Sequence, residues 1–225
     1  MVEVRFLGHS ALLISDGTTR IVVDPFLTGN PKAALPADQV QADLIVLTHA
    51  HGDHYGDSVA LSRRTGAPIV SNYEIVSYAE KQGGQGVGMN LGGTYRFKGG
   101  WLKWLPALHS SSFPDGTYGG LAQGFVLELG GKRIYNAGDT ALFSDMAMVA
   151  SYNIALAILP IGDHFTMGPD DALQALELTK AKQVLPVHYN TFPPIAQDGD
   201  AFIRRAGLLG VGGQALQPGE SLTLS

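Results

Sequence analysis

Residues 48–54 read Thr-His-Ala-His-Gly-Asp-His, which places three imidazoles and one carboxylate within six positions. This stretch directly follows the continuous apolar run Leu44–Leu47, which is typical of a strand that is covered on both faces. Open α/β sheets bind their ligands beyond the ends of their strands. The stretch therefore predicts an α/β fold with a ligand site at one edge of a sheet.

The spacing within this stretch suits metal ions. His49 and His51 are two positions apart, so in an extended segment both side chains point to the same side and can reach one ion. If the chain turns at Gly52, Asp53 and His54 can face a second ion. With further ligands from elsewhere in the chain, these residues are too many for one closed tetrahedral site.

Four other strand candidates also lead into residues that can bind a metal or a substrate. They are Trp101–Leu105 before His109, Lys132–Tyr135 before Asp139, Ile154–Leu159 before His164, and Gln183–Val187 before His188. If these strands share one architecture, their side chains converge on one edge. With Asp139 as a bridge and His109 and His188 as completing ligands, two metal sites become available. Two close cations that share a water give a strong nucleophile at neutral pH and a Lewis acid beside it.

The composition limits the partners of the protein. Of the 225 residues, 45% are hydrophobic and 16% charged, so the chain can bury a large core. It has no cysteine, so any metal must be held by histidine and carboxylate. The formal net charge of −5 argues against a broad nucleic-acid-binding face. The N-terminus lacks a signal-peptide pattern, and no apolar run approaches the about 20 residues that span a bilayer. We therefore expect a cytoplasmic protein with a small-molecule substrate and no nucleic-acid or membrane partner.

The first part of the chain is rich in short β-runs, and strands and helices then alternate. We expect strands at residues 2–6, 11–15, 21–23, 44–47, 67–71, 101–105, 124–129, 132–135, 154–159 and 183–187. We expect helices at 57–64, 73–81, 141–150, 169–180 and 200–205, turns and a hairpin between 82 and 100, and one or two closing strands. Gly130-Gly131 predicts a two-residue hairpin. No linker or charge run divides the chain, so one α/β domain over residues 1–225 is expected.

The order of these residues resembles that of a known superfamily. In the metallo-β-lactamase superfamily the metal ligands occur in a fixed order along the chain. This sequence resembles that series at His49, His51, Asp53, His54, His109, Asp139 and His188. Asp24 matches the upstream aspartate of that series. Four short motifs resemble those of the small metal-dependent hydrolases related to ascorbate-6-phosphate lactonases. They lie at Leu7–Ser10, Asn136–Thr140, Ile161–Pro169 and Pro186–Thr191.

The resemblance implies a four-layer αββα sandwich with the site at one edge of the two central sheets. It also implies two divalent metal ions, for which zinc or manganese is favoured over iron or nickel. The implied ligands are His49, His51 and His109 for the first ion, Asp53, His54 and His188 for the second, and Asp139 as the bridge between them.

Four further polar residues are candidates for the surroundings of the site, namely His9, Asp24, His164 and Asn190. Asp24 can form an ordinary turn before a proline, but we favour a buried carboxylate that orients the metal-binding loop. His9 either lines the pocket or hydrogen-bonds a turn. His164 is expected to contact substrate or water rather than a metal, and Asn190 lies just beyond His188.

Each metal assignment also has a purely structural alternative. Asp139 can cap a helix at 141–150, with or without a ligand role. His109 and His188, each taken alone, are more typical of satisfied core histidines. The complete series favours metal binding at all three positions.

These residues favour a metal-dependent hydrolase. A hydroxide that bridges two divalent metals would attack a small ester, lactone, amide or phosphoester, with Asp53 and Asp139 as the catalytic carboxylates. A nuclease on the same scaffold is an alternative, against which 15 basic residues to 20 acidic ones argue. A di-iron redox protein and a metal-binding protein without catalysis are the others. The resemblance allows a homo-oligomer, although no heptad repeat indicates one.

Overall fold

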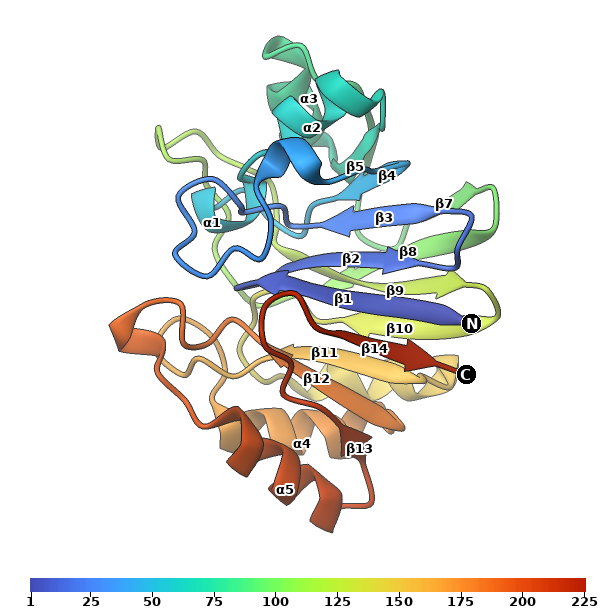
Figure 1. The fold of residues 1–225 in the computed structure, drawn as a ribbon, viewed down its shortest axis with the longest axis vertical. Coiled ribbons are helices and arrows are strands. Elements are labelled where there is room, and N and C mark those ends of the chain that lie inside the picture. Colours follow the sequence, from blue (N-terminus) through green and yellow to red (C-terminus); the bar gives the residue numbers. More distant parts are fainter.

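Two seven-stranded sheets form the centre of the structure, a computed structural model that describes residues 1–225 (Figure 1). The chain enters the first sheet with an alternating strand, in which Val2 and Val4 are buried and Glu3 is exposed. Such alternation is what a strand with one solvent-facing side requires. In spatial order, the strands of this sheet are β14 (Ser221–Leu224), β1 (Val2–Gly8), β2 (Ala11–Ser15), β3 (Arg20–Val23), β4 (Leu44–Val46), β5 (Ile69–Asn72) and β6 (Gly86–Met89).

The second sheet has the same number of strands. In spatial order they are β13 (Gly212–Gly213), β12 (Gln183–Val187), β11 (Leu156–Pro160), β10 (Lys132–Asn136), β9 (Gln123–Leu129), β8 (Gly100–Pro106) and β7 (Thr94–Phe97). The predicted hairpin joins β9 to β10 through Gly130 and Gly131, whose φ angles are 53° and 75°. A two-residue hairpin of this kind needs positive φ at both central positions, so the glycine pair explains the tight turn.

Helices lie on the outer faces of both sheets. Those associated with the first sheet are α1 (Gly52–Tyr55), α2 (Ser58–Thr65) and α3 (Tyr73–Lys81). Those associated with the second are the 3-10 helix η2 (Ser144–Tyr152), α4 (Pro169–Thr179) and α5 (Gly199–Leu208), and two short 3-10 helices, η1 (Ala37–Gln39) and η3 (Pro193–Ile195), lie in loops. Local chemistry explains their starts: Asn72 caps α3 by accepting from the Ile75 N–H, and α4 begins with a proline.

Three buried apolar clusters hold the layers together. The largest lies between the two sheets and includes Val46 from the first and Leu127 from the second. A second cluster joins the first sheet to α2 and α3, and a third joins the second sheet to η2, α4 and α5. Apolar surface is therefore buried at three successive interfaces, which gives the four-layer αββα sandwich that the resemblance implies.

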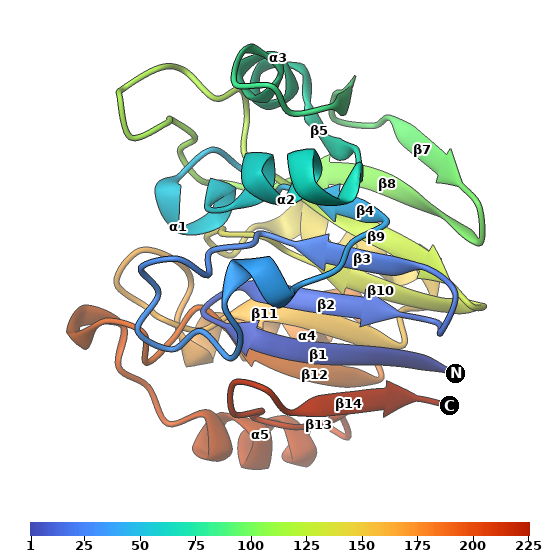
Figure 2. The same cartoon turned by 45° about the horizontal axis from the view of Figure 1, so that its top comes forward.

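The strand directions explain where the polar residues meet. In the first sheet β1, β3 and β4 run the same way, since β1 and β3 are both antiparallel to β2 and β3 is parallel to β4. In the second sheet β8, β10 and β12 run the same way, since β8 and β10 are both antiparallel to β9. The segments that follow these strands gather at one end of the sandwich, on the left in Figures 1 and 2.

One prediction about local structure was wrong. Residues 141–150 do not form a regular helix, because the Ala141 N–H donates to the Leu108 carbonyl and ties this segment to the loop after β8; only the 3-10 helix η2 follows. Asp139 is therefore not a helix cap. The glycine-rich segment 82–100 has the expected turns and hairpin, and it also crosses between the sheets, since β6 joins the first sheet and β7 the second. Its one hairpin is the short turn between β7 and β8.

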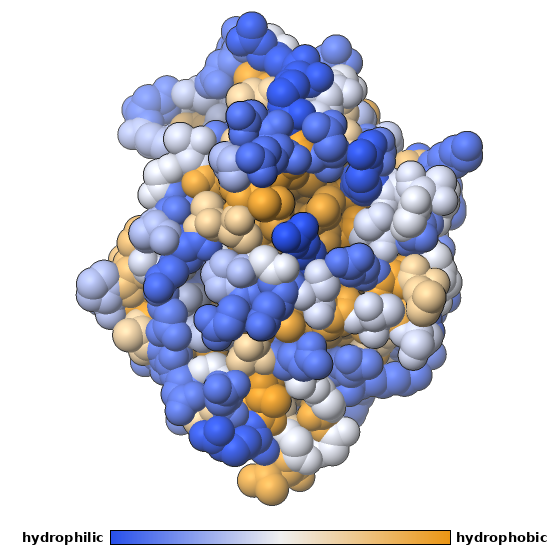
Figure 3. All heavy atoms as spheres, in the orientation of Figure 1, coloured by the Kyte–Doolittle hydropathy of each residue, from blue (hydrophilic) through white to orange (hydrophobic).

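Most other element boundaries agree with the predictions to within one or two residues. The 73–81 helix and the 11–15 and 183–187 strands match the predicted ranges, whereas α5 extends further in both directions than the predicted 200–205 helix. Hydrophilic residues surround a recess in which apolar residues are visible on the face shown in Figure 3. No helix of this structure combines the length and apolar character that crossing a bilayer would require.

We expect truncation of the inter-sheet core to destabilise the fold. Leu127 is fully buried between the sheets, so Leu127→Ala should lower the free energy of unfolding by about 2–5 kcal/mol. Leu208 is 87% exposed, and Leu208→Ala should cost less than about 0.5 kcal/mol. Urea unfolding followed by circular dichroism measures both. Equal effects of the two substitutions would contradict the placement of Leu127 in the core.

Candidate metal centre

Six of the seven histidines meet at the end of the sandwich where the parallel-running strands finish. They form three overlapping groups with aspartates, and within each group the potential ligand atoms lie within 4.8 Å of one another. The first group is His49, His51 and His109, the second is His9, Asp53, His54 and His188, and a third, His49, His54 and Asp139, overlaps both. The loops of both sheets therefore build one cluster of imidazoles and carboxylates.

The first group contains the three histidines that were predicted to share an ion. His49 and His51 follow β4, and the Nε2 of His49 lies 3.0 Å from the Nδ1 of His51. His109 comes from the other sheet, in the loop after β8, and its ring centre lies 5.1 Å from both other rings. His49 is fully buried, whereas His51 and His109 are partly exposed, so this group forms part of the opening of the site.

The second group contains Asp53, His54 and His188, as predicted, together with His9. The turn expected at Gly52 is the short helix α1, which carries both Asp53 and His54. The Nε2 of His188 lies 3.8 Å from the Oδ2 of Asp53. The Asp53 side chain is 32% exposed, so its carboxylate faces both the group and the protein surface.

Asp139 lies between the two groups. Its Oδ2 is 3.0 Å from the Nε2 of His188 and 3.2 Å from the Nε2 of His54, both of the second group. The same oxygen is 3.7 Å from the Nε2 of His109 and 3.9 Å from the Nε2 of His49, both of the first. One carboxylate oxygen thus approaches nitrogens of both groups, which is the arrangement that a bridging ligand needs.

Asp24 and Thr48 orient two of the imidazoles. The carboxylate of Asp24 accepts the Thr48 N–H at 2.8 Å, the Thr48 hydroxyl at 2.7 Å and the Nδ1 of His54 at 2.9 Å. Because the Thr48 hydroxyl donates to Asp24, its oxygen accepts from the Nδ1 of His49 at 3.0 Å. Both histidines therefore keep Nε2 free to bind a cation. Asp24 has the orienting position that the sequence favoured.

His9 supports Asp53 rather than a turn. Its Nε2 lies 3.1 Å from the Oδ2 of Asp53, and its Nδ1 lies 2.8 Å from the hydroxyl oxygen of Thr191. Burial lowers the pKa of His9 to about 4, so the ring is neutral near pH 7. A neutral ring that donates from Nε2 to Asp53 accepts at Nδ1 from the Thr191 hydroxyl, and both nitrogens are then used.

Electrostatics in the cluster favour a cation among the carboxylates. Burial raises the pKa of Asp139, but His188 and His54 outweigh it and hold that pKa well below its usual value. Burial lowers the pKa of His54, yet Asp139 and Asp24 raise it well above 6.5. Burial also lowers the pKa of His49, His51 and His109, which keeps these rings neutral as metal binding requires.

These residues fit divalent metal ions. The Nε2 of His54 is fully buried and lies 3.2 Å from the Asp139 carboxylate, yet it has no hydrogen-bond partner. Buried polar atoms are rarely left without a partner, and a cation bound between this nitrogen and the carboxylate would satisfy it. Imidazole and carboxylate together suit zinc, manganese and iron.

Two predicted pocket residues lie outside the cluster. His164 is exposed and belongs to none of the three groups; its ring packs edge-on against Phe165 at 4.5 Å. Asn190 uses its side-chain amide to hold the loop, donating to the Gln197 carbonyl and accepting the Gln197 N–H at 2.9 Å each. Thr48 was not identified from the sequence as a residue that orients the site. Its position directly after β4, next to the end of β3 where Asp24 lies, could have indicated this role.

A family model described as the β-lactamase superfamily domain matches residues 19–189. The chain belongs to the β-lactamase superfamily. Over its whole length it is 70% identical to a UPF0173 metal-dependent hydrolase of Thermus thermophilus, all of which is covered. It is 46% identical to a UPF0173 metal-dependent hydrolase of Deinococcus radiodurans, with both chains again fully covered.

A solved structure supports the same placement. The chain superposes with a TM-score of 0.91 on Igni18, described as a novel metallo hydrolase of the archaeon Ignicoccus hospitalis, at 36% identity over all of this chain and 98% of the other. Within the β-lactamase superfamily, this chain is therefore one of the metal-dependent hydrolases.

We expect removal of the Asp24 charge to weaken metal binding although Asp24 is not itself in a ligand group. Asp24→Asn should lower metal affinity by about 10- to 100-fold, because His54 loses its orienting acceptor. Asp43→Asn, at an exposed ion pair with Arg20, is the matched control and should leave affinity unchanged. Competition with a chelator measures both, with circular dichroism as the folding check. Unchanged affinity in Asp24→Asn would contradict the orienting role.

Proposed function

We propose that this protein binds two divalent metal ions and hydrolyses a small substrate at an ester, lactone, amide or phosphoester bond. The proposal rests on the position of Asp139, whose Oδ2 lies within 3.9 Å of imidazole nitrogens from both ligand groups. In this reading His49, His51 and His109 would hold one ion and Asp53, His54 and His188 the other, and Asp139 would be placed to bind both. Zinc and manganese are the favoured ions, and the lactonase-like substrate class is part of the same proposal.

The ions, when bound, supply a Lewis acid and make a water nucleophilic near neutral pH. The chain holds the ligands in place through Asp24, Thr48 and His9, each of which contacts at least one of them. Asp53 stays ionised, since burial raises its pKa but His9 and His54 lower it well below its usual value. Its Oδ2 is held by His9, and its Oδ1 makes no hydrogen bond within the protein, so Oδ1 can accept a hydrogen bond from water in the opening.

The surroundings of the opening suit a compact substrate. Phe26 and Phe192 pack against His9, with ring centres 5.8 Å and 5.6 Å from the His9 ring, and both side chains are partly exposed. Apolar rings beside a polar catalytic cluster are typical of small-molecule sites. They support a small organic substrate over a long polymer.

The bridging role of Asp139 predicts distinct metal contents. The wild-type protein should retain about two zinc or manganese ions per chain. His109→Ala removes a ligand of one ion only and should leave about one, whereas Asp139→Ala should lose most of both. Elemental analysis after dialysis measures the contents, and exposed Asp145→Ala is the control. One ion in wild type, or two irons, would contradict the proposal.

Hydrolysis should depend on the ligands and not on histidine content in general. A panel of lactones, esters and phosphoesters is screened first with the metal-loaded protein. His51→Ala should then lower kcat/KM for the best substrate by at least about 100-fold, because an ion loses a direct ligand. His164→Ala should keep the wild-type metal content, since His164 belongs to no ligand group. Full activity of His51→Ala would refute the assignment.

A further inference from the structure

A cavity of about 130 Å³ lies next to the metal centre, between the end of β1 and the loop that follows β12. It is comparable in size with an engineered cavity of about 150 Å³ that binds benzene, so it can take one part of a small substrate. Its walls come from four segments of the chain, and its nine lining residues are Phe6, His9, Lys32, Tyr189, Asn190, Thr191, Leu216, Gln217 and Pro218.

The cavity is lined by one exposed lysine and by no carboxylate, in a protein that is acidic as a whole. Lys32 is its one cationic residue, and none of the nine lining residues is an aspartate or glutamate. The ammonium group of Lys32 makes no ion pair and no hydrogen bond with the protein, whose formal net charge is −5. A lysine with no protein partner beside a cavity is available to bind an anionic group of a ligand.

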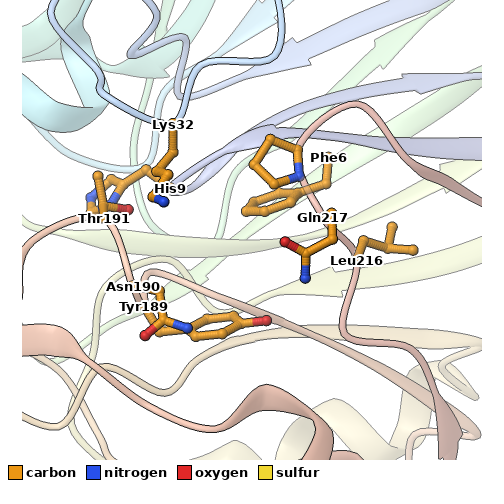
Figure 4. A pocket seen from close by; sticks show the side chains of 9 residues that line it. Phe6, His9, Lys32, Tyr189, Asn190, Thr191, Leu216 and Gln217 are labelled. Carbon is orange, nitrogen blue, oxygen red and sulfur yellow. The ribbon is translucent and has the colours of Figure 1, made fainter.

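The rest of the wall provides both apolar and polar contacts. In Figure 4, Lys32, His9 and Thr191 lie on one side of the pocket, and Phe6, Leu216 and Gln217 lie on the other. The side chains of Phe6 and Leu216 belong to the apolar core between the sheets. The cavity therefore fits a ligand part that combines an apolar portion with a negative charge.

The wall that carries Lys32 is fixed in place by a glycine. Gly8 has a φ of 110°, and a Cβ at this position would lie 2.4 Å from the Lys32 carbonyl oxygen. The neighbouring Ala34 N–H donates to the Leu7 carbonyl at 2.9 Å. The backbone at Lys32 therefore packs directly against the strand that leads into His9, which places the Lys32 side chain beside the cavity.

His9 and Thr191 lie between this cavity and the metal centre. Both line the cavity, and they are hydrogen-bonded to each other at 2.8 Å. The other ring nitrogen of His9 contacts the Oδ2 of Asp53 at 3.1 Å. A ligand in the cavity is therefore separated by one imidazole ring from a carboxylate that we assign to the second ion.

We propose that this cavity binds an anionic group of the substrate, a carboxylate or a phosphate outside the bond that is cleaved, and that Lys32 selects for it. This inference rests on the proposed hydrolase function and narrows the substrate class to small anionic molecules. Phe6 and Leu216 contact the apolar part of the substrate, and Lys32 pairs with the charge.

Three esters that differ in charge test the proposal on the metal-loaded, full-length protein. They are 4-nitrophenyl methyl glutarate, which is neutral, mono-4-nitrophenyl glutarate, and 4-nitrophenyl 4-phosphonobutanoate. Lys32→Gln should lower kcat/KM for a charged ester about tenfold, since a charge-assisted contact is lost, and for the neutral ester less than twofold. Lys32→Arg should restore most of the loss, and the carboxylate and phosphonate arms show which anion is preferred.

Control variants and a binding measurement keep the outcomes separate. Lys81→Gln, at the exposed end of α3, should match wild type with all three esters. Binding of 3-(4-fluorophenyl)propanoate, followed by fluorine NMR, should weaken about tenfold in Lys32→Gln, and binding of its neutral amide should not change. This acid should also inhibit hydrolysis of the neutral ester competitively.

The outcomes distinguish the two proposals. If binding of the acid depends on Lys32 but no ester is hydrolysed, the result would support anion binding in the cavity. It would refute the proposal that the protein hydrolyses such ester bonds. Turnover and binding that are indifferent to Lys32→Gln would overturn the cavity proposal and leave the hydrolase reading intact. Lys32-dependent inhibition that is noncompetitive would also overturn it, because the anion would then occupy a site separate from the substrate.

Discussion

A buried carboxylate must be compensated, and this requirement organises the metal centre. Asp139 is 3% exposed, and an ionised carboxylate at that depth costs several kcal/mol unless positive charge or donors surround it. The structure meets the requirement with four imidazole nitrogens within 3.9 Å of one carboxylate oxygen. These imidazoles come from three separate loops, so the strand ends must meet at one place for Asp139 to be tolerated. A divalent ion would answer the same requirement, because it brings two positive charges next to the carboxylate.

Much of this arrangement could be predicted from the sequence, for a physical reason. His49, His51, Asp53 and His54 are close in the chain, and their spacing alone brings them together. The distant ligands were predictable because each follows a predicted strand, and strands that run in one direction end at one edge of a sandwich. His164 also follows such a strand but lies outside the cluster, so the position after a strand does not determine where a side chain points.

The remaining features depend on contacts that a linear pattern does not contain. The pairing of His9 with Asp53, and the packing of Lys32 against Gly8, join segments about which local propensity says nothing. The segment after Asp139 has helix-compatible residues, but its backbone is held by Leu108 from another loop. His9, Asp24 and His188 also adopt φ angles of 61°, 44° and 56°, an uncommon conformation for residues other than glycine. Such conformations persist where the surrounding structure enforces them, and they concentrate at functional sites.

The division of the ligands between the two sheets has a consequence for folding. His49 and His54 come from loops of the first sheet, whereas His109, Asp139 and His188 come from loops of the second. Any ion held by both sets ties together segments that are distant in the chain, as a disulfide would in a secreted protein, and this chain has no cysteine. Metal binding would then contribute directly to the stability of the native state. The metal centre that we propose to catalyse hydrolysis would also act as a cross-link that holds the two sheets together at this end of the sandwich.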